Sequence, residues 1–284
     1  AFESITDVIK ALPNLARMQA WRSIHDLVAQ HIQHPKLRIV MSFHPLLIGG
    51  NPFSVTCVYS LIHILERRWG VHSAMGGTGA IVQALVNLLQ ERQVPIRYNT
   101  AVTRIQVDNG TATGVVLDGG EVVPADIVVS NGDAAWTYQH LIEPQHRRHW
   151  NDQRIAKGNY SSGLFVWYFG TNRQYTDVPH HMMVLGPRYK GLLQDIFKNH
   201  KLSKDFSLYL YRPTATDPSL APAGCDTFYA LSVVPNLSSG TDWPTISDQY
   251  RDAIASVLQD SVLPDLKQHV VSSKVSTPQD FQDR

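Results

Sequence analysis

The sequence predicts a mixed α/β protein with helices at its start and two separate groups of strands after them. Residues 2–69 carry apolar residues at helical spacing, interrupted by Pro and Gly. Residues 76–131 alternate between a helix pattern and short strand patterns, and residues 164–234 hold four runs rich in aromatic and β-branched residues. These observations predict a helical part, a small α/β unit and a larger mixed sheet.

In the first part, residues 54–69 place Cys57, Leu61, Ile64 and Leu65 on one side, as an amphipathic helix does. Trp21 and Trp69 each stand beside arginines near a helix end. Such pairs suit a membrane interface, where indole rings and cations favour the headgroup level. They also suit ordinary solvated helix ends, and the pattern leaves both interpretations open.

The α/β unit follows in a regular order. Ile81 to Leu88 repeat at helical spacing, and residues 101–107 alternate as a half-buried strand does. Asn109-Gly110 predicts a tight hairpin turn, because this pair accepts positive φ angles. Further strands are expected at residues 94–98, 113–117, 121–124 and 127–129, the last buried on both faces.

The second sheet is expected to contain four strands with helices between or after them. Its aromatic and β-branched runs are typical of strands. The expected strands are residues 164–169, 181–185, 206–211 and 228–234, and the expected helices are residues 189–200 and 246–258.

Composition limits the classes of partner. Among 284 residues, 43% are hydrophobic, and 25 basic against 24 acidic residues give a formal charge of +1. Since this balance gives nucleic acid no general attraction, we expect no nucleic-acid partner. The two cysteines lack C-x-x-C spacing, which favours a reducing compartment and no thiolate metal site. The most apolar short run, residues 163–170, is too short to cross a bilayer.

The glycines at 76–79 invite comparison with a dinucleotide-binding loop. Gly77-Thr78-Gly79 supplies G-x-G, but Val82 stands where the third glycine should be, and no Val- or Ile-rich strand precedes the loop. Tyr98 and Asn99 stand where an acidic residue would bind the ribose. We therefore expect a loop in which Thr78 caps the following helix.

Few residues carry a recognisable catalytic or metal-binding pattern. His31 and His34 lie three apart on an expected helix, with His25 six residues before them, and the three could approach one metal ion; no acidic or thiol partner lies at a matching interval, so no metal site is predicted. Asp7 and Lys10 lie i and i+3 on the first helix, beside apolar residues. They are candidates for acid/base chemistry if they face a cavity, or an exposed pair of little energetic consequence if they do not.

Several separated stretches resemble one family. They are QAWRS (19–23), SFHPLLIGGNPFS (42–54), GGTGAIVQAL (76–85), FGTN (169–172) and SLYLYRPTATDPSLAPAGCDTFYALSVVP (207–235). These stretches resemble bacterial-type phytoene desaturases, which are FAD-dependent carotenoid desaturases related in fold to flavin amine oxidases.

The resemblance implies a composite fold of three regions. Residues 1–72 would be a helical region facing substrate and membrane, residues 73–135 the middle segment of a Rossmann-like FAD-binding domain with a β-meander, and residues 136–284 a mixed-sheet substrate domain. The cofactor would be FAD. Its adenine end would contact the backbone at Val102, and Asn131, Thr78 and Gly79 would lie near the cofactor.

Two segments that are typical of that family are not found in this sequence. Family members open with a strand and G-x-G-x-x-G for the pyrophosphate and close with a glycine-rich segment over the flavin, and neither is in this sequence, which begins at Ala1 rather than Met. We expect a central fragment that by itself binds FAD weakly or not at all and is inactive.

The chemistry implied by the resemblance is hydride transfer from an allylic position of a polyene to flavin, on a peripheral membrane protein of the cytoplasm. The substrate would be phytoene or a related carotenoid precursor, and quinone or oxygen would reoxidise the flavin. Asp7 and Lys10 would act as acid and base. The expected tunnel wall is Phe165, Trp167, Tyr168, Tyr209 and Tyr229.

Two other functions remain open on the sequence. The same fold could isomerise a carotenoid or oxidise another polyene. The chain alone could also act as a non-catalytic lipid-binding or membrane-binding module.

Overall fold

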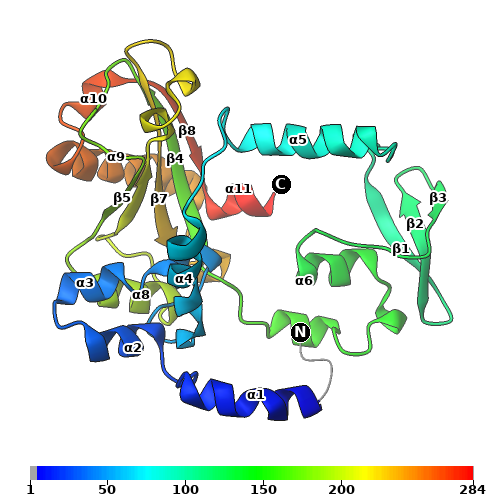
Figure 1. The fold of residues 1–284 in the computed structure, drawn as a ribbon. Helices are drawn as coiled ribbons and strands as arrows, with labels where there is room; N and C mark the ends of the chain where they lie inside the picture. The colour runs from blue at the N-terminus through cyan, green and yellow to red at the C-terminus, as the bar shows by residue number, and fades with distance from the viewer. Residues whose placement is uncertain (1–4, 284) are drawn as a thin grey trace. The chain divides into compact units, whose positions relative to one another are not determined.

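The structure is a computed structural model that describes residues 5–283, with the side chains of residues 9–283 (Figure 1). Two compact units are present. The first unit joins Ala1–Val82 to Ser161–Arg284, and the second unit is Gln83–Tyr160. These units reflect the density of contacts, whereas the predicted regions 1–72, 73–135 and 136–284 follow cofactor and substrate roles, so that division stays a prediction.

The start of the first unit is helical, as the sequence predicts. The Ser23 hydroxyl caps one helix by accepting a hydrogen bond from the Asp26 amide at 3.0 Å. Cys57 is buried, and its thiol lies 3.3 Å from the carbonyl oxygen of Met18, which precedes this helix in the chain. The elements are α1 (Ile5–Arg17), α2 (Ile24–His31), α3 (Pro35–Val40), η1 (His44–Ile48), η2 (Cys57–Ser60) and α4 (Leu61–Trp69).

A five-stranded antiparallel sheet forms the centre of the first unit. Its order is β5-β6-β7-β4-β8, so the long strands β7 and β4 lie in the middle and hydrogen-bond along their whole lengths. Four strands were predicted and β8 was not. The strands are β4 (Gly163–Thr171), β5 (His181–Val184), β6 (Leu208–Tyr211), β7 (Asp226–Val234) and β8 (Val270–Ser276).

One face of this sheet packs on the long helix α9 (Trp243–Ser261) and makes the main hydrophobic core. Phe165 of β4 contacts Trp243 and Tyr250, with ring centroids 5.7 and 4.8 Å apart. Leu208 and Leu210 of β6 are fully buried on the same side. The strict alternation of burial along β7 shows why period-2 patterning predicted these strands.

The opposite face of the sheet is covered only in part. Helix α8 (Tyr189–Phe197) forms a smaller apolar cluster there, with Val233 of β7 and Phe53 from the helical segment packed against it. The remaining elements of the unit are α10 (Leu266–His269), α11 (Pro278–Gln282), η5 (Pro213–Ala215), η6 (Pro218–Leu220) and η7 (Leu237–Ser239).

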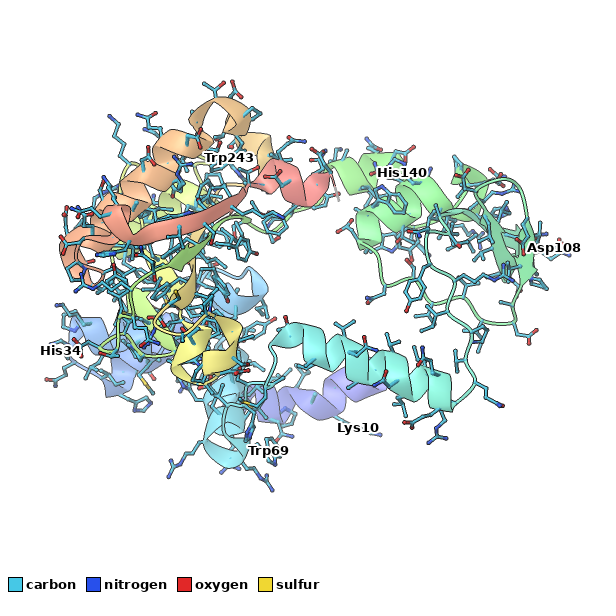
Figure 2. The ribbon with its side chains drawn as sticks, turned by 90° about the horizontal axis from the view of Figure 1, so that it is seen from above. Lys10, His34, Trp69, Asp108, His140 and Trp243 are labelled. Carbon is cyan, nitrogen blue, oxygen red and sulfur yellow. The ribbon has the colours of Figure 1, made fainter. Side chains whose placement is uncertain are left out.

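The second unit holds a three-stranded meander of order β1-β2-β3. Asn109 and Gly110 both have positive φ, 49° and 81°, which confirms the predicted hairpin turn next to Asp108 (Figure 2). Helix α5 (Thr78–Glu91) leads into this unit. Its other elements are β1 (Val102–Asp108), β2 (Thr111–Leu117), β3 (Val122–Pro124), α6 (Ala134–Trp136), η3 (Thr137–Leu141), η4 (Pro144–His146) and α7 (Asp152–Ala156).

Two predicted strands of this region are wrong. Residues 94–98 and 127–129 form no strand, and Ile127 and Val129 are 80% and 85% exposed. A strand requires a neighbour that pairs its backbone N–H and C=O groups. Among the described residues, no named strand pairs with either segment, so the apolar pattern alone does not fold them.

The mixed α/β class is confirmed. Within residues 5–283, no helix combines the length and the apolar character that a membrane crossing requires.

Candidate functional site

Two adjoining cavities open on the sheet face that α9 does not cover. The larger has a volume of about 920 Å³ and the smaller about 550 Å³. Val71, His181, Tyr209 and Tyr229 line both, so the two cavities meet over strands β5, β6 and β7. Each volume lies in the range of roughly 300–1,000 Å³ that small-molecule sites occupy.

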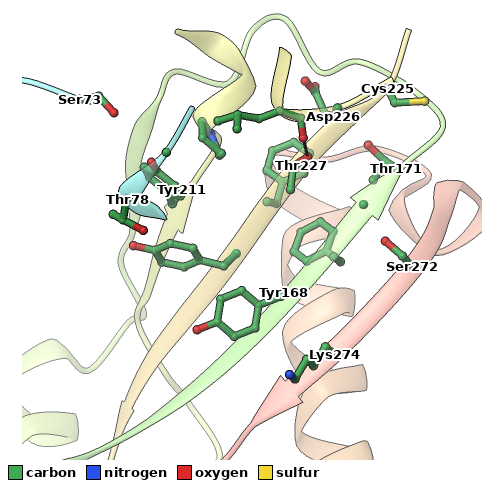
Figure 3. A pocket seen from close by; sticks show the side chains of 18 of the residues that line it. Ser73, Thr78, Tyr168, Thr171, Tyr211, Cys225, Asp226, Thr227, Ser272 and Lys274 are labelled. Carbon is green, nitrogen blue, oxygen red and sulfur yellow. Dashed lines mark hydrogen bonds between the residues drawn. The ribbon is translucent and has the colours of Figure 1, made fainter. Parts of the chain in front are cut away.

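A row of large side chains crosses the sheet beneath the larger cavity. Antiparallel register places Tyr168 opposite Tyr229, Tyr229 opposite Tyr211, and Tyr211 opposite His181. Directly opposed residues lie on one face. Successive ring centroids are 5.8, 4.7 and 5.5 Å apart. We call these four residues the aromatic row; Lys274 of β8 lies opposite Tyr168 at its end (Figure 3).

The structure divides the predicted tunnel wall between two faces. Tyr168, Tyr209 and Tyr229 line the cavities. Phe165 and Trp167 lie on the other face and are 0% and 2% exposed. Phe165 packs against α9, and the indole N–H of Trp167 donates to the Ser273 hydroxyl at 2.8 Å. Neither lines either of these two cavities.

The sequence reasoning missed Tyr211 and His181. Tyr211 follows Tyr209 at a spacing of two and therefore shares its face, so strand alternation was a usable signal. His181 joins the aromatic row only because β5 pairs with β6 in a register that places it opposite Tyr211, and this register cannot be predicted from the sequence.

Burial favours the uncharged forms of a histidine and two tyrosine side chains that line the cavities. Burial, and next the charge of His180, lower the pKa of His181, whose Nδ1 is hydrogen-bonded to the Tyr209 hydroxyl at 2.5 Å. Burial raises the pKa values of Tyr209 and Tyr229. At neutral pH these groups therefore carry no charge and favour an apolar ligand with a few polar anchoring points.

A carboxylate already occupies the glycine loop before α5. The backbone N–H of Gly76 donates to Asp217 Oδ2 at 2.6 Å, and this bond is the main cause that lowers the pKa of Asp217. Gly76 and Gly77 have φ of 83° and 78°, which only glycine adopts readily. An anionic Asp217 at this place repels a phosphate, which supports the loop interpretation over a dinucleotide site.

A buried ion pair fixes the end of β7 beside the larger cavity. Arg212 Nε donates to Asp226 Oδ2 at 2.8 Å, and the other carboxylate oxygen accepts from the Thr214 hydroxyl at 2.6 Å. The Tyr175 amide and the Val178 carbonyl complete the hydrogen bonding of the pair. With every partner in place, this cluster positions the loops at the cavity rim rather than acting on a ligand.

The predicted cofactor residues fall in both units. Thr78 lines the larger cavity in the first unit, and a Cβ on Gly79 would meet no atom within 4 Å. Val102 and Asn131 belong to the second unit, where Asn131 is exposed. Val102 begins β1, an edge strand of the meander, so one side of its backbone has no strand neighbour among the described residues.

Of the predicted acid/base pair, the structure describes the side chain of Lys10 alone. Lys10 is exposed on α1 and is not among the described residues that line the two cavities. The side chain of Asp7 lies outside the described residues. The pair therefore stays a prediction.

Comparison with known proteins identifies what the chain is similar to. Residues 6–224 match the model of the family described as flavin containing amine oxidoreductase. The chain is 45% identical to the neurosporene-forming phytoene desaturase of Cereibacter sphaeroides, over 100% of the chain and 56% of that protein. It is 39% identical to the lycopene-forming phytoene desaturase of Pantoea ananas, over 100% and 58%. These matches confirm the resemblance, and the chain spans about half the length of these relatives.

Solved structures agree on the fold. An oxidoreductase from Methanosarcina mazei superimposes with a TM-score of 0.66 at 18% identity, covering 96% of this chain and 61% of that one. A redesigned putrescine oxidase gives 0.55 at 11% identity, covering 92% and 55%. At this identity the likeness concerns the fold alone.

Proposed function

Because the chain belongs to the flavin-containing amine oxidoreductase family, we propose that it forms the substrate-binding and middle cofactor-binding parts of an FAD-dependent desaturase acting on a long polyene such as phytoene. The observation that carries this proposal is the aromatic row, which lines the larger of two adjoining cavities. An uncharged, elongated wall of rings suits a hydrocarbon that has no hydrogen-bonding group of its own.

The side chains of the cavities would bind, orient and desolvate the polyene. Tyr168, Tyr209 and Tyr229 would contact it through their ring faces, and the smaller cavity, lined largely by Leu, Met and Val, would hold an apolar end. Phe165 and Trp167 would support this wall from behind as members of the core. We retain Asp7 and Lys10 as proposed acid and base, since loss of hydride and formation of a double bond also require loss of a proton.

The proposed cofactor is FAD, which when bound would supply the hydride acceptor. The backbone at Val102 is proposed to contact its adenine end, and the edge position of β1 supports this, because backbone groups of an edge strand are available to a ligand. Asn131 is proposed to lie near the cofactor. Thr78 and Gly79 are proposed to lie near it. The Asp217 carboxylate at the glycine loop argues that the pyrophosphate binds elsewhere.

The exposed apolar residues of the second unit support the proposal that this unit is one part of a larger flavin domain. Leu85, Leu88, Ile127 and Val129 are 47–85% exposed, although apolar residues of such patterns usually pack. Since the relatives are nearly twice as long as this chain, we propose that the remainder of the flavin domain covers these residues.

We further propose that the first unit lies on a membrane surface of the cytoplasm, where a carotenoid precursor dissolves. Leu61, Ile64, Leu65 and Trp69 follow one side of α4 at helical spacing, and each is at least 41% exposed (Figure 2 marks Trp69). Arg67 and Arg68 flank this side in the last turn, where cations meet lipid headgroups.

The enzymatic proposal is tested with the full-length protein, FAD and phytoene in liposomes. Desaturation lengthens the conjugated system, so we expect products with visible absorbance and a reduced flavin before quinone or oxygen reoxidises it. Mass spectrometry separates desaturation from isomerisation, because isomerisation leaves the mass unchanged. A colourless product and a flavin that stays oxidised would exclude the proposed reaction.

The membrane proposal is tested by flotation of the protein with liposomes. Trp69→Ala and Trp21→Ala should each reduce the floating fraction, because both indoles are exposed in the first unit, 60% and 72%. Trp150→Ala, which removes an indole of the second unit that is 45% exposed, is the control. Equal flotation of all four proteins, or none, would contradict the proposal.

A further inference from the structure

Three metal-ligating side chains meet beside the smaller cavity. His44 begins η1, and His63 and Glu66 lie three residues apart on α4, hence on one side of that helix. One possible ligand atom from each residue lies within 4.8 Å of those of the other two. His44 Nε2 is 3.4 Å from Glu66 Oε2, and the two imidazole centroids are 4.1 Å apart.

The hydrogen bonding of His63 leaves one ring nitrogen able to bind a metal. Its Nε2 lies 2.9 Å from the carbonyl oxygen of Met41. A carbonyl only accepts, so this nitrogen carries the proton and Nδ1 carries the lone pair. Metal-binding histidines in proteins are oriented in the same way, by donating the other ring N–H to a carbonyl or carboxylate.

His44 is prepared for the same role by its burial. It is 5% exposed, and its Nδ1 has no hydrogen-bond partner among the described residues. Burial lowers the pKa of His44, so the ring is neutral at pH 7 as a ligand must be. Glu66 lies beside Nε2 of this ring, and Nδ1 is a buried polar atom that the apolar packing leaves without a partner in the described part of the chain.

We propose that His44, His63 and Glu66 bind one divalent transition-metal ion, with Zn²⁺ the ion of choice. Two imidazoles and a carboxylate match zinc better than magnesium or calcium, which prefer oxygen ligands. Tetrahedral zinc would bring ligand atoms to about 3.3 Å from one another, given bond lengths of about 2.0 Å. Since these atoms lie within 4.8 Å, small side-chain rotations close the site.

The ion would join η1 to α4 at the wall of the smaller cavity, which His44 and Glu66 both line. Three protein ligands leave a fourth position for water. Because the unfolded chain lacks the assembled site, binding should stabilise the folded protein. This inference is independent of the polyene and of FAD, since neither is needed for the ion to bind.

The test is direct binding to the untagged, chelator-treated full-length protein. Isothermal titration with Zn²⁺ should give one site, and Co²⁺ should give the visible absorption of a tetrahedral complex. His63→Ala and Glu66→Gln should each weaken zinc binding at least tenfold. Zinc should also raise the unfolding temperature of the parent protein but not of these two variants.

His72→Ala is the matched control, because this exposed histidine follows α4 and bonds only the Trp69 carbonyl among the described residues. It should bind zinc as the parent does. Thermal unfolding without metal shows whether each variant is folded, which matters most for buried His44. Equal zinc binding by the parent, His63→Ala and Glu66→Gln, or absence of binding by the folded parent, would overturn the proposal.

Discussion

The Gly76 amide and the Asp217 carboxylate are joined by a 2.6 Å hydrogen bond across 141 residues of sequence. This bond ties the loop before α5 to the loop after β6, and both loops line the larger cavity. The wall of the cavity is therefore continuous although its residues come from distant parts of the chain.

Replacing Asp217 by Ala should release the glycine loop. Hydrogen exchange of the Gly76 amide should become faster, since the bond that protects it is lost. Asp217→Asn is the control, because its side-chain oxygen can still accept from Gly76. If the two variants exchange at the same rate as the parent protein, this bond does not hold the loop.

Removal of Arg212 should destabilise the first unit strongly. Arg212→Met leaves the fully buried Asp226 carboxylate without its cation, and loss of one member of such a pair costs about 3–5 kcal/mol of the free energy of unfolding. The double variant Arg212→Met/Asp226→Leu should recover part of this loss. Arg251→Met is the control, since its partners Asp248 and Asp252 are exposed. Urea unfolding that shows equal effects of Arg212→Met and Arg251→Met would contradict the assignment.

The two faces of β4 should respond differently to truncation. Phe165→Ala empties a core position and should lower the free energy of unfolding by about 3–5 kcal/mol. Tyr168→Ala, at a side chain that is 40% exposed, should lower it by about 0.5 kcal/mol or less. Tyr168→Ala should instead weaken binding of phytoene, measured by quenching of protein fluorescence. A large loss of stability in Tyr168→Ala with unchanged binding would reverse the assignment of the faces.

The protein should lose stability in mild acid. Burial lowers the pKa of His180 and of His181 in the folded state, whereas the unfolded chain titrates near pH 6.5. As pH falls below about 6.5, the unfolded state binds protons first, so the free energy of unfolding decreases, and it is retained above this pH. Tyr209 and Tyr211 face His181, and burial raises the pKa of Tyr209 further above this range.

The acid effect is measured by urea unfolding at pH 5.5 and 7.5. His181→Gln should reduce the difference between the two pH values, because the glutamine does not titrate there. His149→Gln, at an exposed histidine of the second unit, is the control. A pH difference that is the same in His181→Gln as in the parent would refute the contribution of His181.

Local pattern predicted much of this fold. The alternation of β4, β6 and β7, the helix that became α5, and the Asn109-Gly110 turn all follow from short-range sequence rules. Strand β8 was missed, because its exposed Ser272, Ser273 and Lys274 make it a polar segment that becomes a strand only by pairing with β4. Residues 127–129 show the converse, an apolar pattern with no neighbour to pair with.

The candidate site depended on long-range relationships that no local rule contains. The sequence could name Tyr168, Tyr209 and Tyr229 as wall residues, but only the register of β4 on β7 separates them from Phe165 and Trp167. His44 and His63 meet because η1 packs beside α4, a contact invisible in the spacing of the two residues.

Strand β4 supplies the core with one set of alternate residues and the cavity wall with the other. Inserting or deleting one residue within it would exchange the two sets, turning Phe165 and Trp167 outward and Tyr168 into the packing against α9. Substitutions at alternate positions of β4 can thus change which ligand the cavity prefers and leave the core intact. A change in the length of the strand cannot, because it would also disrupt the core. The substrate preference of this wall can therefore evolve only through the alternate residues of β4 whose side chains face the cavity.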